Sequence, residues 1–176
     1  MTIQYLERPI ETEYSEYAAG YVALVPENDV LKVMREQIEI VRELISSISA
    51  EQELFRYAPE KWSIREMVGH LNDGERVFGF RAFTFARGDS AALPGFEEND
   101  YVRESNSDQV PLPDLLAEFI ALRQSNVMML EQLKEEAWER VGVANDNAVT
   151  VRAIVWIMAG HIRHHLNILT ERYLQK

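Results

Sequence analysis

Apolar residues recur at helical spacing in four separate segments of this chain. In the first segment they follow Pro26 in alternating steps of three and four residues, which aligns them in one stripe along a helix. The stripe consists of Leu31, Met34, Ile38, Val41, Ile45 and Ile48. Asn28 or Asp29 precedes the stripe, and either side chain can cap the free amides of a first turn. The pattern therefore predicts a helix that begins close to residue 29.

The second segment has a complete helix start signal. Ser63 and Glu66 are spaced as a capping box, in which each side chain bonds to the backbone amide of the other residue. Trp62 and Met67 flank the box at positions where two apolar side chains can meet. The inward positions of this segment are Ile64, Met67, Leu71, Phe78 and Phe85. We expect the helix to continue through the last of these and to stop at Gly88.

The third and fourth segments complete the set. Pro111 and Pro113 mark the start of the third, whose apolar positions are Leu115, Phe119, Leu122, Leu130 and Leu133. The fourth begins near Thr150 and extends almost to the C-terminus, with apolar positions Ile154, Met158, Ile162, Leu169 and Tyr173. No strand-like alternation of useful length competes with these assignments. Four long amphipathic helices predict an all-α four-helix bundle.

Two other stretches connect or extend the predicted helices. The connection over residues 88–110 is long for a helix hairpin, so we expect it to cross the bundle or to cover one of its ends. Residues 1–26, which include Tyr14, Tyr17 and Tyr21, predict a partly helical arm that lies against the bundle. The 176 residues have the length of one ordinary domain, and we expect 1–176 to fold as a single domain.

The composition excludes several kinds of site. The chain has no cysteine, so it offers no thiol nucleophile, disulfide or thiolate metal site. A transition metal would have to be held by histidine, carboxylate or water. The formal net charge of -11 and the pI near 4.8 argue against electrostatic binding of nucleic acid, which requires clustered lysine and arginine.

The sequence carries no signal for export or for membrane insertion. The start, MTIQYLERPIETEYSEY, lacks the basic and apolar regions of a signal peptide. The longest apolar run, residues 153–160, is too short to span a bilayer. We therefore expect a cytoplasmic protein that does not bind membranes.

Three of the four histidines lie in the last predicted helix. His161 and His165 are one turn apart, so their rings project from the same, apolar face. His70 lies at the edge of the inward face of the second predicted helix. If these two helices are neighbours, the three imidazoles can share one ion and leave an open coordination position, as in catalytic sites. The spacing predicts a divalent metal site at His70, His161 and His165.

The alternative interpretation is a set of hydrogen-bonded core histidines, which is the more common reason for a single inward histidine. The HxxxH pair on an apolar face, with a separate inward histidine, favours a metal, because an unpaired buried imidazole costs free energy. His164 projects at the flank of the same helix. We interpret it as a group behind the ligands or on the surface.

Two acids near His70 could assist the chemistry. Asp73 is one turn further along the helix and Glu75 follows two residues later, so either could orient a ligand, bind the ion or act as catalytic acid or base. A solvated helix face is an equally good interpretation of each acid. Asn126, on or near the third apolar stripe, could hydrogen-bond a ligand imidazole or a substrate, or could be a local polar defect.

Several stretches together resemble the DinB/YfiT-like superfamily of metalloenzymes, and they occur in the family's order and spacing. They are EYSEYAAGYVALVP (13–26), WSIREMVGHLNDGE (62–75), PGFEENDYV (94–102) and AGHIRHHLNIL (159–169). The first resembles the lead-in found in one branch of the family. The resemblance implies that His70, His161 and His165 are the metal ligands, in agreement with the spacing.

The resemblance also implies a fold and a range of activities. The bundle would run up-down-down-up with a long connection between its second and third helices, and it would commonly form a homodimer. Relatives bind zinc or nickel with water in the open position. They include thiol-dependent S-transferases, a mycothiol-dependent isomerase and proteins classed as hydrolases. Many relatives have an acid directly after the first histidine of the last motif, whereas this chain has Ile162 there, which excludes a glutamate-assisted mechanism at that position.

These observations lead to one functional hypothesis and one alternative. The hypothesis is a divalent-metal-dependent enzyme, a hydrolase or a low-molecular-weight thiol S-transferase, whose ion lowers the pKa of a bound water or thiol. Its substrate would be a small molecule, and any sulfur nucleophile must come from that substrate. Asp73 or Glu75 would be the catalytic acid or base. The alternative is a non-catalytic, stress-related metal-binding or scaffold domain.

Overall fold

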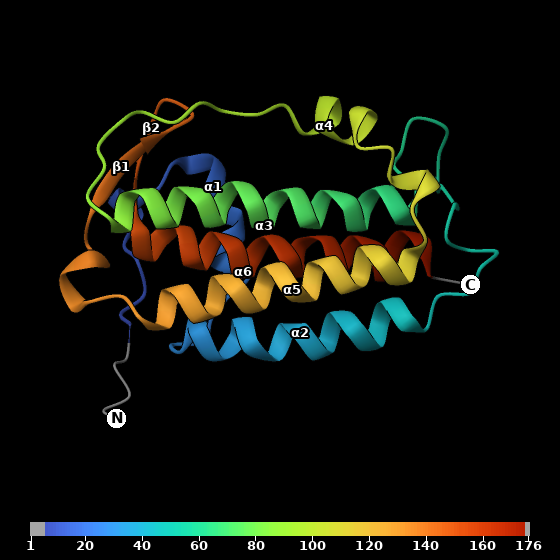
Figure 1. Cartoon of the computed structure of the whole chain (residues 1–176), viewed down its shortest axis with the longest axis horizontal. Helices are drawn as coiled ribbons and strands as arrows, with labels where there is room; N and C mark the ends of the chain where they lie inside the picture. The colour runs from blue at the N-terminus through green and yellow to red at the C-terminus, as the bar shows by residue number, and fades with distance from the viewer. Residues whose placement is uncertain (1–5, 175–176) are drawn as a thin grey trace.

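Four long helices lie side by side in the computed structural model, which describes residues 6–174 (Figure 1). They are α2 (Val30–Ser46), α3 (Ile64–Ala86), α5 (Leu112–Glu131) and α6 (Val151–Ile168), and α6 continues as a wider helical turn over Leu169–Tyr173. Both α2 and α3 pack against α5 and α6. The predicted four-helix bundle is therefore confirmed, and the two helices that carry the histidines, α3 and α6, are neighbours.

The helices run in the order up-down-down-up. In Figure 1, α2 and α6 run in one direction, whereas α3 and α5 run in the other. Parallel neighbours need a long connection, and the segment between α3 and α5 passes back along the length of the bundle. This segment contains α4 (Glu98–Glu104) and a short turn of helix, Ser107–Gln109. Of the two placements that the sequence left open, the crossing of the bundle is the one observed.

The helix starts follow the predicted capping chemistry. Asp29 rather than Asn28 caps α2, and its Oδ1 accepts a hydrogen bond from the amide of Lys32 at 2.9 Å. The capping box of α3 is complete, because Ser63 Oγ accepts from the amide of Glu66 at 3.0 Å and Glu66 Oε2 accepts from the amide of Ser63 at 2.9 Å. The predicted inward residues are buried, apart from four that are half-buried, Leu31, Ile38, Phe78 and Leu122.

One element differs from the sequence prediction, which contained no strand. β1 (Val141–Ala144) and β2 (Asn147–Thr150) form an antiparallel hairpin before α6. Asn145 and Asp146 form its turn with φ of 51° and 59°, the left-handed conformation that a tight two-residue hairpin turn requires. Four-residue strands are too short to give a periodic signal, so the Asn-Asp pair was the only indication in the sequence.

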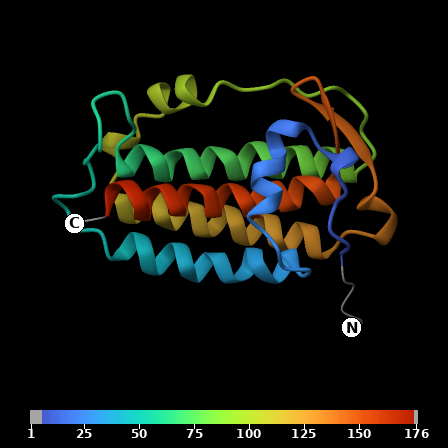
Figure 2. The same cartoon turned by 180° about the vertical axis from the view of Figure 1, so that it is seen from behind.

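The N-terminal arm contains a short helical turn, Glu11–Glu13, and the helix α1 (Glu16–Ala23), and α1 lies across α6 (Figure 2). A Cβ atom at Gly160 of α6 would collide with the carbonyl oxygen of Tyr21, so only glycine allows this close approach. The arm is helical and packs against the bundle, as predicted, although its residues 1–5 lie outside the described part. No helix within residues 6–174 is long and apolar enough to cross a membrane.

Candidate metal centre

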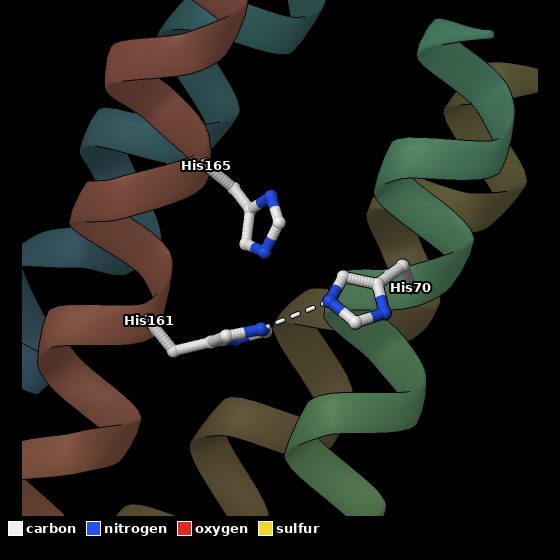
Figure 3. Close-up of side chains that lie close together, drawn as sticks. All are labelled: His70, His161 and His165. Carbon is white, nitrogen blue, oxygen red and sulfur yellow. Dashed lines mark hydrogen bonds between the residues drawn. The ribbon is translucent and has the colours of Figure 1, made fainter. Parts of the chain in front are cut away.

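Helices α3 and α6 bring three histidines together in the interior of the bundle. His70 projects from α3, and His161 and His165 project from successive turns of α6 toward it (Figure 3). Their exposed fractions are only 1%, 4% and 7%, respectively. Three imidazoles from segments about 90 residues apart in the chain therefore meet at one buried point, as the spacing predicted.

The ring nitrogens are close enough to hold one ion. The Nε2 atoms of His70 and His161 are 3.0 Å apart. One nitrogen from each of the three rings lies within 4.8 Å of the others. Ligand nitrogens about 2.0–2.1 Å from a tetrahedral zinc lie roughly 3.4 Å from one another. Small side-chain rotations are enough to reach this spacing, so the geometry fits a divalent metal.

The polar contacts of the rings do not support the alternative of ordinary hydrogen-bonded core histidines. The hydrogen bond between His70 and His161 joins two of the three rings to each other. The Nδ1 atoms of His70 and His165 are buried and have no hydrogen-bond partner within residues 6–174. The rings are thus turned toward a shared point rather than toward separate protein partners, which is the arrangement expected of metal ligands.

Burial keeps the three imidazoles uncharged. It lowers the pKa of His70 to about 4 and that of His165 to about 2, with a smaller contribution from the neighbouring histidines. The same cause holds the pKa of His161 well below its ordinary value of 6.5. A neutral imidazole has the free electron pair that a metal requires, so the donors are in the ligating form at neutral pH.

Aromatic side chains fix the orientation of the imidazoles. The indole of Trp62, just before α3, lies 4.7 Å from the ring of His70 and stacks at 6.2 Å on that of His165, measured between centroids. Tyr21 and Phe78 pack edge to face against the imidazole of His161, with centroid distances of 5.7 and 5.5 Å. Packing of this kind restricts ring rotation, which pre-organises the ligand set.

A cavity of about 270 Å³ opens onto the histidine cluster. His70 and His161 form part of its wall, together with residues of α1, of the segment before α4 and of the β1–β2 hairpin. Its other lining residues include Tyr17, Tyr21, Phe78, Arg81, Phe96, Glu97, Glu98 and Asn145. The cluster is therefore buried but not closed, because a small molecule can reach two of its three rings.

A sequence profile described as the DinB superfamily matches residues 34–169, which is most of the chain and includes all three histidines. This chain belongs to the DinB superfamily. The match confirms the resemblance noted from the sequence motifs. None of the curated protein sequences matches this DinB protein.

Two solved structures from Bacillus subtilis share the fold of this DinB protein. YfiT, described as a probable metal-dependent hydrolase with an unusual four-helix bundle topology, superimposes with a TM-score of 0.68 at 17% identity, over 93% of this chain and 89% of YfiT. The DinB-like protein YjoA superimposes with a TM-score of 0.58 at 22% identity, over 82% of this chain and 88% of YjoA. At these identities the likeness shows the common fold.

The two acids predicted as catalytic groups do not line the cavity of this DinB protein. Asp73 is half-buried in a separate surface cleft, where its Oδ1 lies 3.8 Å from Arg76 Nη1. Glu75 is buried between helices and pairs with Arg123 at 2.7 Å. Asn126, which the sequence left open as a ligand partner or a polar defect, donates to Glu75 Oε2 at 2.9 Å. The structure therefore separates both acids from the residues that surround the cavity.

His164 has the flanking position expected from the sequence. It is half-buried, and its ring packs edge to face on those of Tyr21 at 5.4 Å and His165 at 5.0 Å. It is not one of the three clustered histidines that could hold a metal. His164 therefore stands behind a ligand ring rather than beside the other two.

Sequence reasoning missed two charged residues of the cavity, Arg81 and Glu98, and one charged residue of the bundle interior, Arg123. Glu98 lies within the PGFEENDYV motif, but nothing in the motif shows that the connection folds over the histidines. Arg81 is eleven residues after His70, a spacing that returns to the same face of a helix, and this was its only signal. Arg123 interrupts the apolar stripe of α5 at helical spacing, which could have identified it as a buried charge.

Proposed function

We propose that this protein is a metal-dependent hydrolase of a small molecule, in which His70, His161 and His165 hold a divalent ion, zinc or nickel. The observation that carries the proposal is the cavity, which reaches two of the three buried imidazoles. A purely structural metal site is closed and saturated by protein ligands, whereas a catalytic site keeps a position open to the substrate. The description of YfiT as a probable metal-dependent hydrolase supports the same class.

The ion, when bound, would supply Lewis acidity at the inner end of the cavity. The protein supplies three neutral donors and an aromatic enclosure of Trp62, Tyr21 and Phe78. This enclosure keeps bulk water away from the donors and so strengthens electrostatic interactions in the site. The walls of the cavity orient the substrate toward the imidazoles.

Glu98 is our candidate for the group that accepts or donates a proton during hydrolysis. It is half-buried in the first turn of α4 and lines the cavity together with His161. Burial, and then the charge of Glu97, raise the pKa of its carboxyl group. A raised carboxyl pKa brings the group closer to the range in which it can exchange a proton at neutral pH. Asp73 and Glu75 lack this access to the cavity.

The experiment described next also tests two other functions for this site. Transfer of a low-molecular-weight thiol would use the same three donors, and its sulfur would come from the substrate because the chain has no cysteine. A stress-related metal-binding or scaffold domain would bind the ion without turnover. The open cavity favours catalysis over a metal-binding or scaffold role, because a scaffold needs no passage to its metal.

The test combines elemental analysis with an activity panel. Freshly purified protein should contain about one zinc or nickel per chain, and chelator-treated protein should contain none. The metal-loaded protein should hydrolyse at least one member of a panel of esters, amides and lactones, with thiol-transfer substrates assayed in parallel. His161→Ala should lose both metal and activity, whereas His164→Ala should retain the metal. Full activity in His161→Ala would reject the metal mechanism.

Glu98→Gln tests the acid separately. It should keep the metal and the fold but lower the rate of hydrolysis by about 100-fold, in line with the usual contribution of general acid-base catalysis. An unchanged rate would remove Glu98 from the mechanism and leave the metal site intact.

We infer the quaternary structure from the family and the location from the sequence. We propose a cytoplasmic homodimer that acts on a small molecule and binds neither nucleic acid nor membranes. Light scattering after size-exclusion chromatography should give a mass of about twice 20.4 kDa. A monomeric mass over the working concentration range would refute the dimer.

A further inference from the structure

Arg81 and His70 lie on the same face of α3. Arg81 follows His70 by eleven residues, about three helical turns, and Gly74 and Phe78 lie between them on that face. Side chains of a helix tilt toward its N-terminus, so the guanidinium reaches back in the direction of His70. Both residues line the same cavity. The cavity therefore has imidazole donors in one part of its wall and a cation in another.

The Arg81 guanidinium has no negatively charged protein partner. Its Nη2 donates to the carbonyl oxygen of Pro94 at 2.9 Å, and its Cζ lies 5.9 Å from the centroid of the Phe78 ring. Within residues 6–174, no carboxylate oxygen lies within 4.0 Å of its nitrogens. Arg81 is partly buried, and burial disfavours its charge. The hydrogen bond to Pro94 is solvent-exposed and, among the described residues, no Arg81 nitrogen is buried without a partner, so the remaining guanidinium donors are accessible to a ligand that enters the cavity.

Two acids also line the cavity, but neither neutralises Arg81. The Glu97 side chain turns back to its own helix, where Oε1 lies 3.4 Å from the amide of Asn99. Neither carboxylate oxygen of Glu98 lies within 4.0 Å of an Arg81 nitrogen. The acids and the cation therefore act at different places in the cavity wall.

The remaining wall is mostly apolar and includes four aromatic side chains. Tyr17 and Tyr21 come from α1, Phe78 comes from α3 and Phe96 comes from the segment before α4. Aromatic surfaces bind the apolar part of a ligand, while a few polar groups fix its orientation. The volume of about 270 Å³ fits a metabolite-sized molecule rather than a polymer.

We propose that Arg81 binds the carboxylate, or another oxyanion, of the substrate, and that the substrates are small organic anions with an apolar body. The guanidinium would hold the acid group through two parallel N–H···O bonds, and the apolar body would lie on the aromatic side chains of the wall. The bond to be cleaved would then face His70 and His161. This inference rests on the proposed function and specifies the class of substrate for that same site.

A matched pair of probes tests the proposal by calorimetry on the metal-loaded protein. The probes are 4-phenylbutanoate and its neutral amide, 4-phenylbutanamide. Wild type should bind the carboxylate about tenfold tighter than the amide, as expected for a hydrogen-bonded ion pair. Arg81→Gln keeps a donor for Pro94 and should lose this preference. Arg81→Lys keeps a cation without the planar fork and should show an intermediate preference.

Arg87 provides the matched control. It caps the C-terminal end of the same helix, is exposed and does not line the cavity. Arg87→Gln removes the same charge and should keep the tenfold preference. Thermal unfolding of each variant checks that the fold is retained, and if Arg81→Gln fails to fold, Arg81→Lys against wild type decides the result.

His161→Ala separates the two possible anion sites, because a carboxylate can also bind a metal directly. In this variant the preference should persist, since Arg81 is intact. A preference that survives in Arg81→Gln but is lost in His161→Ala would overturn the proposal, and so would the absence of any preference in wild type. By contrast, an Arg81-dependent preference in a protein that binds no metal would refute the proposed function and leave the anion site standing.

Discussion

Glu75 of α3 and Arg123 of α5 form an ion pair in the centre of the bundle, with 2.7 Å between Oε1 and Nη2 and exposed fractions of only 2% and 0%. Arg123 also donates to Gln37 Oε1 at 3.2 Å, and Gln37 donates to the carbonyl oxygen of Ala159 at 2.7 Å. This polar network connects α2, α3, α5 and α6 next to the histidine cluster. It fixes the relative positions of the helices that carry the three histidines.

Breaking this pair should destabilise the fold strongly. In Arg123→Met the Glu75 carboxylate would stay buried without its cation, so we expect a loss of about 3–5 kcal/mol in the free energy of unfolding. Urea denaturation measures the change. The exposed pair of Arg42 and Glu39 on α2 is the control, because Arg42→Met should cost less than about 1 kcal/mol.

A double variant tests whether the uncompensated charge causes the loss. In Arg123→Met/Glu75→Met both charges are gone and similar volumes remain, so stability should recover toward that of wild type. A double variant no more stable than Arg123→Met would show that the network is needed for its geometry rather than for charge balance.

Gly74→Ala should weaken metal binding. A Cβ atom at this position of α3 would lie 2.8 Å from Cε1 of His161, so the imidazole would have to move. We expect the affinity for zinc, measured by competition with a chelator, to fall by about tenfold or more. Gly20→Ala is the control, since a Cβ at Gly20 meets nothing within 4 Å. Equal zinc affinities in Gly74→Ala and wild type would contradict this account.

The metal-free protein should lose stability on mild acidification. Burial lowers the pKa of His70 to about 4 and of His165 to about 2, against an ordinary value of 6.5. Below pH 6.5 the unfolded chain binds protons that the folded chain does not, so the free energy of unfolding falls as the pH decreases toward 4. Above pH 6.5 this contribution is fully present.

Urea titrations of chelator-treated protein at pH 7.5, 6.5 and 5.5 measure this dependence. His70→Gln removes one of the buried imidazoles and should show a shallower decline than wild type. A free energy of unfolding that stays constant over this range in wild type would show that the imidazoles are solvated rather than buried.

Metal binding should stabilise the fold through His161. A ligand that binds only the folded state adds about 2.7 kcal/mol when its free concentration is 100 times the dissociation constant. Zinc should therefore raise the unfolding temperature of wild type and of His164→Ala, and a chelator should reverse the effect. In His161→Ala the same addition should have little effect. An equal rise in all three proteins would indicate adventitious zinc binding elsewhere.

Much of the bundle could be predicted from local signals. The stripe of α2, the capping box at Ser63 and the start of the last helix near Thr150 each depend on residues within one or two turns, and each was confirmed. The β1–β2 hairpin could not be predicted in this way, because two four-residue strands carry too little periodicity. The path of the connection between α3 and α5 also stayed open, since a long loop contains no local indication of the surface that it covers.

The sequence by itself determined the four helices, their inward faces and the pair of imidazoles one turn apart on α6, because helix geometry converts spacing along the chain directly into direction in space. Only the tertiary structure decided that His70 completes the cluster, that Glu75 meets Arg123 instead of the cavity, and that Arg81 and Glu98 line it. These contacts join residues on different helices and loops. They depend on how whole elements pack, and no local pattern of residues encodes that packing.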